Sequence, residues 1–482
     1  MEELVAQAKE YEAAGYDVFK LDSNDVKTAQ AVRNATNMVV FTQLQEAAIP
    51  MMASADSPGI SNRNQPTAAE IEKAVEAARK LESLVDILWL RSDEHPNAWT
   101  QDKGKPRSLA YAEAIKKAGI KVITCPSGGF HYPLDNDEFI ASGKTDMVGM
   151  TTPLFADAEL VRKIQAGMAD EITPCIGCEN CHGITMTAGQ YFSTCTVNPK
   201  WGLPPYKLAS ITAPRKTKKV AVIGGGPAGM KAAIIAAERG HKVTLYEKSD
   251  ALGGELKISD YTQWRWAFKD LKDYYIYQVN KKGVEVLLST KATPEIIKSK
   301  GYNTVLVAAG AEPIFSTLES EGRANVFNLM DAYYNKKALG HNVVIIGSGK
   351  FVTECGCGLA KDGHKVTVLA SAKELVEPEN KGPHNMQYPL AIAQYHPNFS
   401  SVLEAKVKSV TGGKVTYTDA TGAEKSVQAD SIVVWSGVKP RMDEAEKFFG
   451  SADEVLLLGD CTGRNGMLHK AIRSAFFVAS QV

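Results

Sequence analysis

Half of the cysteines in the 482-residue sequence lie between positions 175 and 195, where their thiols could bind a metal centre. In a reducing compartment such a group is typical of metal ligation rather than of disulfide bonds. The spacing is C-x2-C-x2-C-x13-C, and the four residues are Cys175, Cys178, Cys181 and Cys195. Three closely spaced thiolates and a more distant fourth can enclose one [4Fe–4S] cluster, which is the interpretation that the spacing favours.

Two other interpretations of this segment remain open. A zinc site with four thiolates has the same number of ligands, although two successive spacings of two residues are short for zinc. The stretch from Cys178 to His182 matches the C-x-x-C-H pattern of haem attachment, but haem would leave Cys175 and Cys195 without a role. We therefore expect iron–sulfur chemistry, which is the transfer of single electrons.

A glycine-rich segment that starts at residue 220 has the pattern of a dinucleotide-binding site. An apolar strand leads into Gly224, Gly226 and Gly229, and Glu247 follows at the end of the next strand. The three glycines permit a tight turn, the close approach of a pyrophosphate and close packing of helix on strand. The helix N-terminus then faces the phosphates, and the acid accepts hydrogen bonds from ribose hydroxyls.

Three later segments resemble parts of FAD-binding proteins of the disulfide-reductase type. They are LGGE (252–255), TVLVAAGAEP (304–313) and LGD (458–460). The resemblance implies that Gly254 and Gly459 belong to the cofactor site and that Asp460 holds the ribityl chain. We therefore expect the first dinucleotide to be FAD.

A second dinucleotide pattern begins near residue 342 and departs from the first. Gly347 and Gly349 keep their places, but Val352 stands where the third glycine is expected, and Ala370 replaces the acid. Without the acid a 2′-phosphate is not repelled, and Lys373 could pair with it. The sequence therefore slightly favours NADPH over NADH, and a structural domain that binds no nucleotide is the alternative.

These motifs need strands and helices to hold them, and the sequence predicts an α/β protein throughout. Residues 1–165 alternate helical and strand-like segments in five βα-type units, which indicate a partial parallel barrel. A small cysteine-rich segment covers 166–205. Two Rossmann-like domains of the disulfide-reductase type follow, one for FAD (217–335 plus 428–482) and one for NAD(P) (336–427).

Composition and charge exclude several classes of function. Lys plus Arg and Asp plus Glu each number 55, so the net charge is zero and no nucleic-acid partner is expected. No apolar run approaches the length of a bilayer span. The first residues also lack the basic n-region and apolar core of a secretory signal. The sequence therefore predicts a cytoplasmic protein without a membrane partner.

In this order, the modules resemble the iron–sulfur flavoprotein branch of the old yellow enzyme family, which includes 2,4-dienoyl-CoA reductase, 2-enoate reductases and trimethylamine dehydrogenase. In that branch a (β/α) TIM-type barrel with FMN precedes the cluster and the FAD and NAD(P) domains. The resemblance implies that Gly128, Gly129 and Gly149 bind the FMN phosphate, although the sequence leaves open whether FMN binds. It also implies electron flow from NAD(P)H through FAD, cluster and FMN to an activated C=C bond.

The barrel part departs from the family pattern. A closed barrel takes about 250 residues, and far fewer precede the cysteines here. The region where family members have a His and a catalytic Tyr reads VFKLD (18–22), and Thr152 stands where an Arg is expected. The catalytic residues are therefore unknown.

Three functions fit this pattern. The first is an NAD(P)H-dependent reductase of activated alkenes. The second is an electron-transfer subunit of a hetero-oligomer, in which a partner completes the barrel and carries the catalytic site. The third is an amine dehydrogenase, because trimethylamine dehydrogenase shares the spacing of the first three cysteines. Each implies a small-molecule redox substrate or an electron carrier as partner, and an uncovered sheet edge implies an oligomer.

Overall fold

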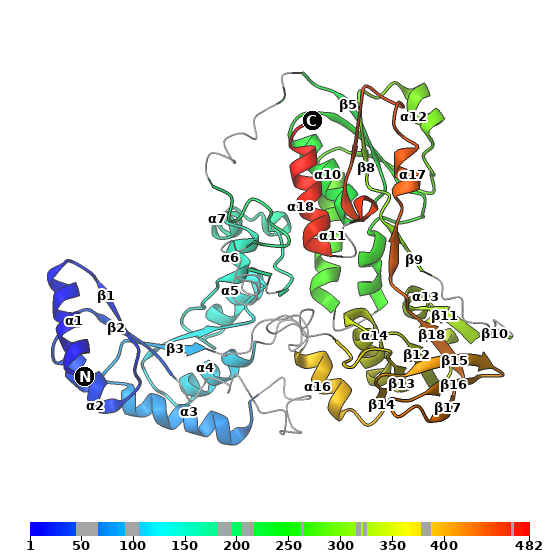
Figure 1. Ribbon diagram of the computed structural model, residues 1–482. Coiled ribbons are helices and arrows are strands. Elements are labelled where there is room, and N and C mark those ends of the chain that lie inside the picture. Colours follow the sequence, from blue (N-terminus) through cyan, green and yellow to red (C-terminus); the bar gives the residue numbers. More distant parts are fainter. Residues whose placement is uncertain are drawn as a thin grey trace. The chain divides into compact units, whose positions relative to one another are not determined.

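A computed structural model describes residues 1–44, 66–91, 106–178, 180–181, 194–204, 214, 216–261, 265–314, 320–321, 325–376, 387–463 and 467–482. The chain divides into two compact units, Met1–Ile172 and Thr173–Val482, and each is described by itself (Figure 1). Both units contain parallel strands joined by helices, so the predicted α/β class is confirmed. Within the described ranges, none of the helices could span a bilayer.

The first unit contains a four-stranded parallel sheet with the strand order β1-β2-β3-β4. Its elements are α1 (Glu2–Ala13), β1 (Val18–Leu21), α2 (Val26–Arg33), β2 (Val39–Gln43), α3 (Ala68–Leu81), β3 (Ile87–Arg91), α4 (Arg107–Lys117), β4 (Ile123–Ser127), α5 (Pro133–Ala141), α6 (Thr152–Ala156), α7 (Leu160–Gln165) and the 3-10 helix η3 (Ala169–Glu171). Local sequence explains two of the helix starts. Asp25 caps α2 by accepting a hydrogen bond from the Thr28 N–H, and Thr67 and Glu70 form a reciprocal capping box at α3.

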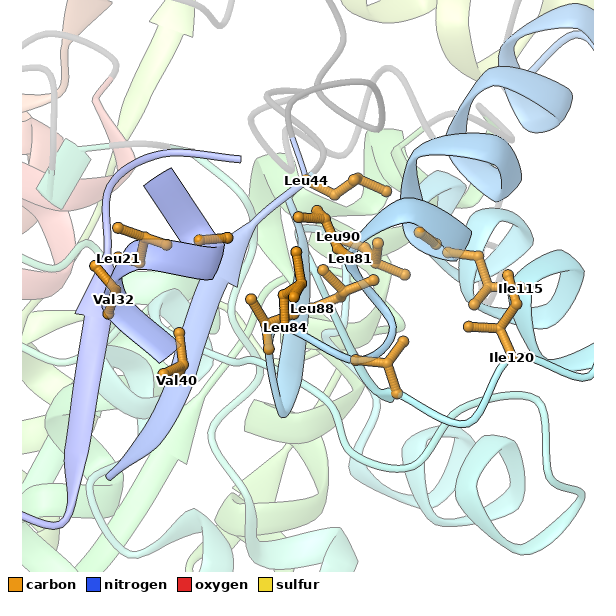
Figure 2. Close-up of a cluster of buried hydrophobic side chains, with 14 of the residues drawn as sticks. Leu21, Val32, Val40, Leu44, Leu81, Leu84, Leu88, Leu90, Ile115 and Ile120 are labelled. Carbon is orange, nitrogen blue, oxygen red and sulfur yellow. The ribbon is translucent and has the colours of Figure 1, made fainter. Parts of the chain in front are cut away.

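The helices bury one face of this sheet, and this layer is the core of the first unit. Figure 2 shows Leu21 of β1 beside Val32 of α2, and Leu88 and Leu90 of β3 beside Leu81 of α3. The alternation of buried and exposed positions along each strand follows from the two-residue period of β-structure. The helices are held to the sheet by this apolar contact.

In the described part of the chain, the other face of the sheet is open. Val18, Val39 and Ile123 lie on it and are 51%, 37% and 41% exposed. Parallel strands of α/β proteins are normally covered on both faces. In a complete barrel the corresponding face lines the interior. The first unit therefore has the strands and outer helices of part of a barrel, without its closure.

The sheet has four strands where the sequence predicts five. The segment 145–150 makes only one bridge, between Ser127 and Gly149. The segment does make two backbone bonds to β4, from the Met147 N–H to the Thr124 carbonyl at 3.2 Å and from the Gly149 N–H to the Pro126 carbonyl at 2.8 Å. The Thr124 N–H, however, donates to the Asp146 carboxylate at 2.8 Å, and Thr145 Oγ1 donates to the Thr124 carbonyl at 3.1 Å. These local bonds compete with a strand ladder.

The second unit contains two five-stranded parallel sheets. The first has the order β20-β8-β5-β6-β7. Its elements are β5 (Lys219–Ile223), α10 (Pro227–Glu238), β6 (Lys242–Tyr246), η4 (Gly254–Tyr261), α11 (Trp266–Lys281), β7 (Glu285–Leu287), α12 (Pro294–Lys300), β8 (Thr304–Val307), α17 (Met442–Glu446), β20 (Glu454–Leu457), η8 (Gly459–Thr462) and α18 (Leu468–Ala479). The helices α10, α11 and α18 pack together beside this sheet (Figure 1).

The second sheet has the order β11-β18-β12-β13-β14, and a smaller sheet, β10-β15-β16-β17, shares its hydrophobic core. The elements are β10 (Ser320–Glu321), β11 (Val326–Asn328), α13 (Leu329–Tyr334), η7 (Lys336–Ala338), β12 (Asn342–Ile346), α14 (Lys350–Lys361), β13 (Lys365–Leu369), α16 (Gln387–Tyr395), β14 (Phe399–Val402), β15 (Lys406–Thr411), β16 (Lys414–Thr418), β17 (Glu424–Gln428) and β18 (Ser431–Val434). The chain crosses between the two five-stranded sheets twice, along β9 (Ala311–Pro313) and β19 (Val438–Pro440), which pair antiparallel.

The strands β11 and β18 hydrogen-bond in the second sheet, although the FAD-binding domain predicted from the sequence includes their residues. The sequence shows where a strand occurs more readily than which sheet it joins. The division of the chain into four domains stays a prediction.

Candidate functional site

The glycines of the first dinucleotide motif lie in the loop between β5 and α10. Gly224 has a φ of +104°, and a Cβ there would lie 2.3 Å from the Ala308 carbonyl oxygen. A Cβ at Gly229 would lie 1.8 Å from the Gly224 carbonyl oxygen. A side chain at Gly224 would push the loop away from Ala308, and one at Gly229 would push α10 away from the loop. Glycine is therefore needed at both positions, as the motif predicts. Gly226 is the N-cap of α10, so the helix N-terminus opens at this loop.

Glu247, directly after β6, stabilises the same loop. Its carboxylate accepts hydrogen bonds from the Gly225 N–H at 2.7 Å and from the N–H and hydroxyl of Ser249, both at 2.7 Å. The side chain is buried next to the loop. Each carboxylate oxygen has two lone pairs, so Oε2 keeps one for a ribose hydroxyl. Its predicted contact with the ribose is compatible with this position.

Gly254 and Gly459 come from distant parts of the sequence to the same loop. A Cβ at Gly254 would lie 2.8 Å from Gly226 Cα, and a Cβ at Gly459 would lie 2.9 Å from Ala228 Cβ. The Gly459 N–H donates to Ser474 Oγ at 2.9 Å, which ties η8 to α18. Backbone without side chains therefore surrounds the start of α10, as a bound pyrophosphate requires.

Glu255 and Arg441 join the predicted Asp460 in this site, and sequence reasoning assigned neither of them. The side chain of Glu255 is exposed, yet the protein around its carboxyl and, next, the Asp460 charge together raise its pKa to about 7, while Arg441 opposes the rise. The only sequence signal for Glu255 is its position directly after Gly254. Arg441 follows β19, so its approach depends on the crossing of the chain between the sheets.

The second dinucleotide motif lines a cavity of about 530 Å³ at the ends of β12, β13 and β18. The lining includes Gly347, Ser348, Ser371, Lys406 and Trp435. Such a cavity at the carboxyl ends of parallel strands is where nucleotides bind in this type of sheet. The predicted Gly347 lines it directly, and Gly349 is the N-cap of α14.

The departures of this motif from the first have structural consequences. Val352 is completely buried, and its side chain lies beside Gly347, whereas the first motif has a glycine at this position and backbone packed against it. The closest approach of α14 to the sheet is made at Gly356, where a Cβ would lie 2.8 Å from the Phe399 ring. Lys373 is exposed and is not part of the cavity lining, whereas Lys406 at the start of β15 is.

The four clustered cysteines belong to the second unit, and all of them are half-buried. The Cys178 thiol donates to Thr196 Oγ1 at 3.1 Å, and the Asn180 amide donates to Thr194 Oγ1 at 3.2 Å. The segments before and after residues 182–193 are thus brought together, with Cys178 beside Cys195. The remaining cysteines are Cys125, Cys355, Cys357 and Cys461, and all four are buried.

The donor set suits an iron–sulfur cluster. Burial raises the pKa of Cys195 to about 11; the backbone amides of Asn198 and Val197 and the Lys231 charge lower it, and the neighbouring Cys178 raises it. Among the described residues, no three His, Cys, Asp or Glu side chains gather closely enough to hold a single metal ion. A [4Fe–4S] cluster takes one thiolate for each of its four irons, and the number and type of these residues fit it.

The glycines predicted to bind an FMN phosphate lie at the end of β4 and beyond it in the first unit. Gly128 and Gly129 have positive φ angles of 92° and 81°. The Gly149 N–H donates to the Pro126 carbonyl at 2.8 Å, so this amide is engaged within the protein. Gly128 and Gly129 are then the remaining donors of the predicted phosphate site, which stays a prediction.

Comparison with known proteins identifies relatives of both units. The pyridine nucleotide-disulphide oxidoreductase family matches residues 218–475. Cinnamate reductase of Clostridium sporogenes is 33% identical over 384 residues, which cover 78% of this chain and 55% of that protein. NADH oxidase of Thermoanaerobacter brockii is 32% identical over 384 residues, which cover 77% of this chain and 57% of that protein. The matches therefore span just over half the length of these relatives.

Among solved structures, a 2-naphthoyl-CoA reductase in complex with 2-naphthoyl-CoA has a TM-score of 0.83 and 24% identity to this chain. The likeness covers 100% of this chain and 76% of the other. At this identity it bears on the fold alone. It confirms the predicted combination of a partial barrel with Rossmann-like domains of the disulfide-reductase type.

Proposed function

Because the chain belongs to the pyridine nucleotide-disulphide oxidoreductase family and to the iron–sulfur flavoprotein branch of the old yellow enzymes, we propose that it is an oxidoreductase. In this proposal it oxidises NAD(P)H at FAD and passes the electrons to a [4Fe–4S] cluster. One observation carries the proposal: helix α10 starts at the FAD loop, and its Lys231 lies within electrostatic range of Cys195. Helix α10 thus begins at the flavin loop and carries a lysine that lies near one of the cysteines.

The chain's own residues have defined tasks in this function. Bound FAD would accept a hydride, and a cluster would carry its electrons singly. Gly224, Gly226 and Gly229 admit the pyrophosphate, and Glu247 orients the ribose while fixing the loop. Asp460 and Glu255 lie where the ribityl chain and the flavin would meet the protein. The four cysteines, Cys175, Cys178, Cys181 and Cys195, would hold the cluster.

The cavity beside Gly347 supports NAD(P)H as the electron donor. The position of the missing acid is taken by Ala370, which is completely buried and carries no charge to repel a 2′-phosphate. Ser371 and Lys406 line the cavity next to it. A hydroxyl and a cation there suit a phosphate, so we propose NADPH as the preferred donor.

For the electron acceptor we propose an alkene conjugated to a carboxylate or to a thioester. The support is that relatives are named for the reduction of cinnamate and 2-naphthoyl-CoA, in which a carbonyl activates the carbon–carbon bond. We place the protein in the cytoplasm, where thiols stay reduced until a cluster is inserted.

A second candidate is an electron-transfer subunit, and the open face of the β1–β4 sheet favours it. A parallel sheet that carries exposed Val18, Val39 and Ile123 needs a cover. A partner chain that supplies further βα units would cover this face and carry the catalytic groups. In this case the chain alone would oxidise NADPH with an artificial electron acceptor but would reduce no alkene.

The test uses anaerobically purified protein with its cofactors. NADPH is expected to bleach the flavin absorbance, and cinnamate or a cinnamoyl thioester is then expected to restore it. Bleaching without recovery on any enoate would favour the electron-transfer subunit. If neither NADPH nor NADH bleaches the flavin, the proposed function is wrong.

A further inference from the structure

Tyr275 in helix α11 is completely buried, and among the described residues its hydroxyl makes no hydrogen bond. Buried polar groups nearly always have a partner, so this hydroxyl is a candidate to bond a group bound next to it.

The surroundings of Tyr275 indicate which group that is. The Lys231 ammonium lies 5.8 Å from the centre of the Tyr275 ring. The Cys195 thiol lies within electrostatic range of both side chains. Tyr275, from α11, and Lys231, from α10, therefore lie near the cysteine that the sequence predicts as the last cluster ligand.

The neighbouring residue shows that the two tyrosines have different tasks. The Tyr274 hydroxyl pairs with Thr173 Oγ1 at 3.0 Å, just before the first of the clustered cysteines. The Tyr274 hydroxyl thus has a partner within the chain, which distinguishes it from the Tyr275 hydroxyl. A tyrosine hydroxyl carries its proton at neutral pH, so Tyr275 can act as a hydrogen-bond donor.

We propose that the Tyr275 hydroxyl donates a hydrogen bond to a sulfur of the cluster that Cys195 would hold, and that Tyr275 and Lys231 together raise the reduction potential of this cluster. The inference rests on the cluster of the proposed function. Reduction by one electron makes the sulfurs more negative, and hydrogen-bond donors and nearby cations stabilise that charge. Since Lys231 is one turn beyond the pyrophosphate loop, its helix connects the flavin site with the tuned ligand.

The test is Tyr275→Phe, which removes the hydroxyl and keeps the ring that fills the core. Tyr274→Phe is the matched control, because it removes the hydroxyl of the adjacent residue whose bond goes to Thr173. The midpoint potential of the cluster is measured by reductive titration followed by electron paramagnetic resonance. Tyr275→Phe is expected to shift the ratio of oxidised to reduced cluster at least tenfold toward the oxidised form, which is about 59 mV for one electron.

Lys231→Met gives a second measurement that does not depend on the hydroxyl. It is expected to lower the midpoint potential as well, and Tyr274→Phe is expected to leave it unchanged. Equal potentials in wild type, Tyr275→Phe and Lys231→Met would overturn the inference while the cluster itself is present. A wild-type protein without iron or acid-labile sulfide would instead overturn the proposed function, so the two failures are distinguishable.

Discussion

The two Rossmann-type motifs of the second unit share one plan and differ at the positions that decide how a nucleotide is held. In the first, Gly229 lets α10 approach the loop so closely that a Cβ would lie 1.8 Å from a carbonyl oxygen, and Glu247 fixes that loop by three hydrogen bonds. In the second, Val352 stands at the position of the glycine, and Ala370 provides no carboxylate. The cavity beside the second loop is lined by Ser371 and Lys406.

The difference separates two ways of binding. The first loop is rigid, surrounded by backbone and suited to a cofactor that stays bound through many turnovers. The second loop opens on a cavity that Lys406 lines, and Ala370 stands at the position of the acid. Such a cavity suits a nucleotide that enters and leaves. This comparison predicts that substitutions in the first motif cost the protein its flavin, and that substitutions in the second change only its choice of nucleotide.

The largest effect is expected from Gly229→Val. The added side chain would collide with the Gly224 carbonyl, and such overpacking costs about 1–3 kcal/mol or more in a well-packed site. We expect less than about a tenth of the wild-type FAD content after purification, as a loss of about 1.4 kcal/mol in binding is tenfold. Val352→Gly, the reverse change in the second motif, should leave the FAD content unchanged. A fully flavinated Gly229→Val protein would contradict the role given to this glycine.

The next effect is expected from the ion pair that joins helix α11 to helix α14 of the second motif. Arg265, at the start of α11, pairs with Glu354 in α14, and both side chains are almost buried. Removing one partner leaves the other charge buried, so Glu354→Ala should lower the free energy of unfolding by about 3–5 kcal/mol. Denaturant unfolding measures it. Glu424→Ala, which removes an exposed pair with Lys408, is the control and should change nothing measurable. Equal stability of the two variants would show that this pair does not hold the two helices together.

A smaller effect is expected from the two lysines near the second motif. Lys406→Ala should weaken the binding of 2′,5′-ADP about tenfold, because a charge-assisted bond to the phosphate is lost. Binding of 5′-ADP, which lacks the 2′-phosphate, should change little in the same titration. Lys373→Ala is the matched control, since Lys373 is exposed and outside the cavity lining. If Lys373→Ala weakens the binding of 2′,5′-ADP and Lys406→Ala does not, Lys373 pairs with the 2′-phosphate as the sequence predicts, and the assignment of Lys406 is wrong.

The smallest effect is a pH dependence from Glu255 in the FAD-free protein. Its pKa is raised from 4.5 to about 7, chiefly by burial and then by Asp460. Between these values the folded state binds more protons than the unfolded state, so this group makes stability fall as the pH rises. The temperature of thermal unfolding, measured from pH 4.5 to 7, should therefore fall less steeply with pH in Glu255→Gln than in the wild type. The exposed Glu446→Gln is the control. An unchanged slope in Glu255→Gln would contradict the raised pKa.

The parts of the site that sequence predicts well are those that depend on near neighbours. Gly224, Gly226 and Gly229 lie within one turn and a helix start, so their spacing alone determines the loop. Lys406 lies far along the chain from Ala370, and its place at the cavity follows from the Ala405 N–H bonding to the Ala370 carbonyl at 2.9 Å. No local pattern encodes such a contact, so sequence reasoning chose the nearer Lys373.

The barrel part shows the same limit. The alternation of apolar residues predicts four strands of the first unit, each of which is covered by helices on one face. The fifth segment keeps two backbone bonds and a single bridge to β4, because Asp146 takes the Thr124 N–H with its side chain, a competition that apolar periodicity does not reveal. The open face of the sheet also could not be predicted, since a strand's sequence does not state what covers its second side.

The most direct test of the central claim is the cofactor content of anaerobically purified protein. Iron, acid-labile sulfide and FAD are measured per chain in the wild type, in Cys178→Ser and in Cys355→Ser, whose thiol is buried away from the cysteine segment. The account predicts four irons, four sulfides and one FAD in the wild type and in Cys355→Ser. It predicts loss of iron and sulfide with retention of FAD in Cys178→Ser. A wild-type protein that binds FAD but no iron, or a Cys178→Ser protein with its full iron content, would contradict it.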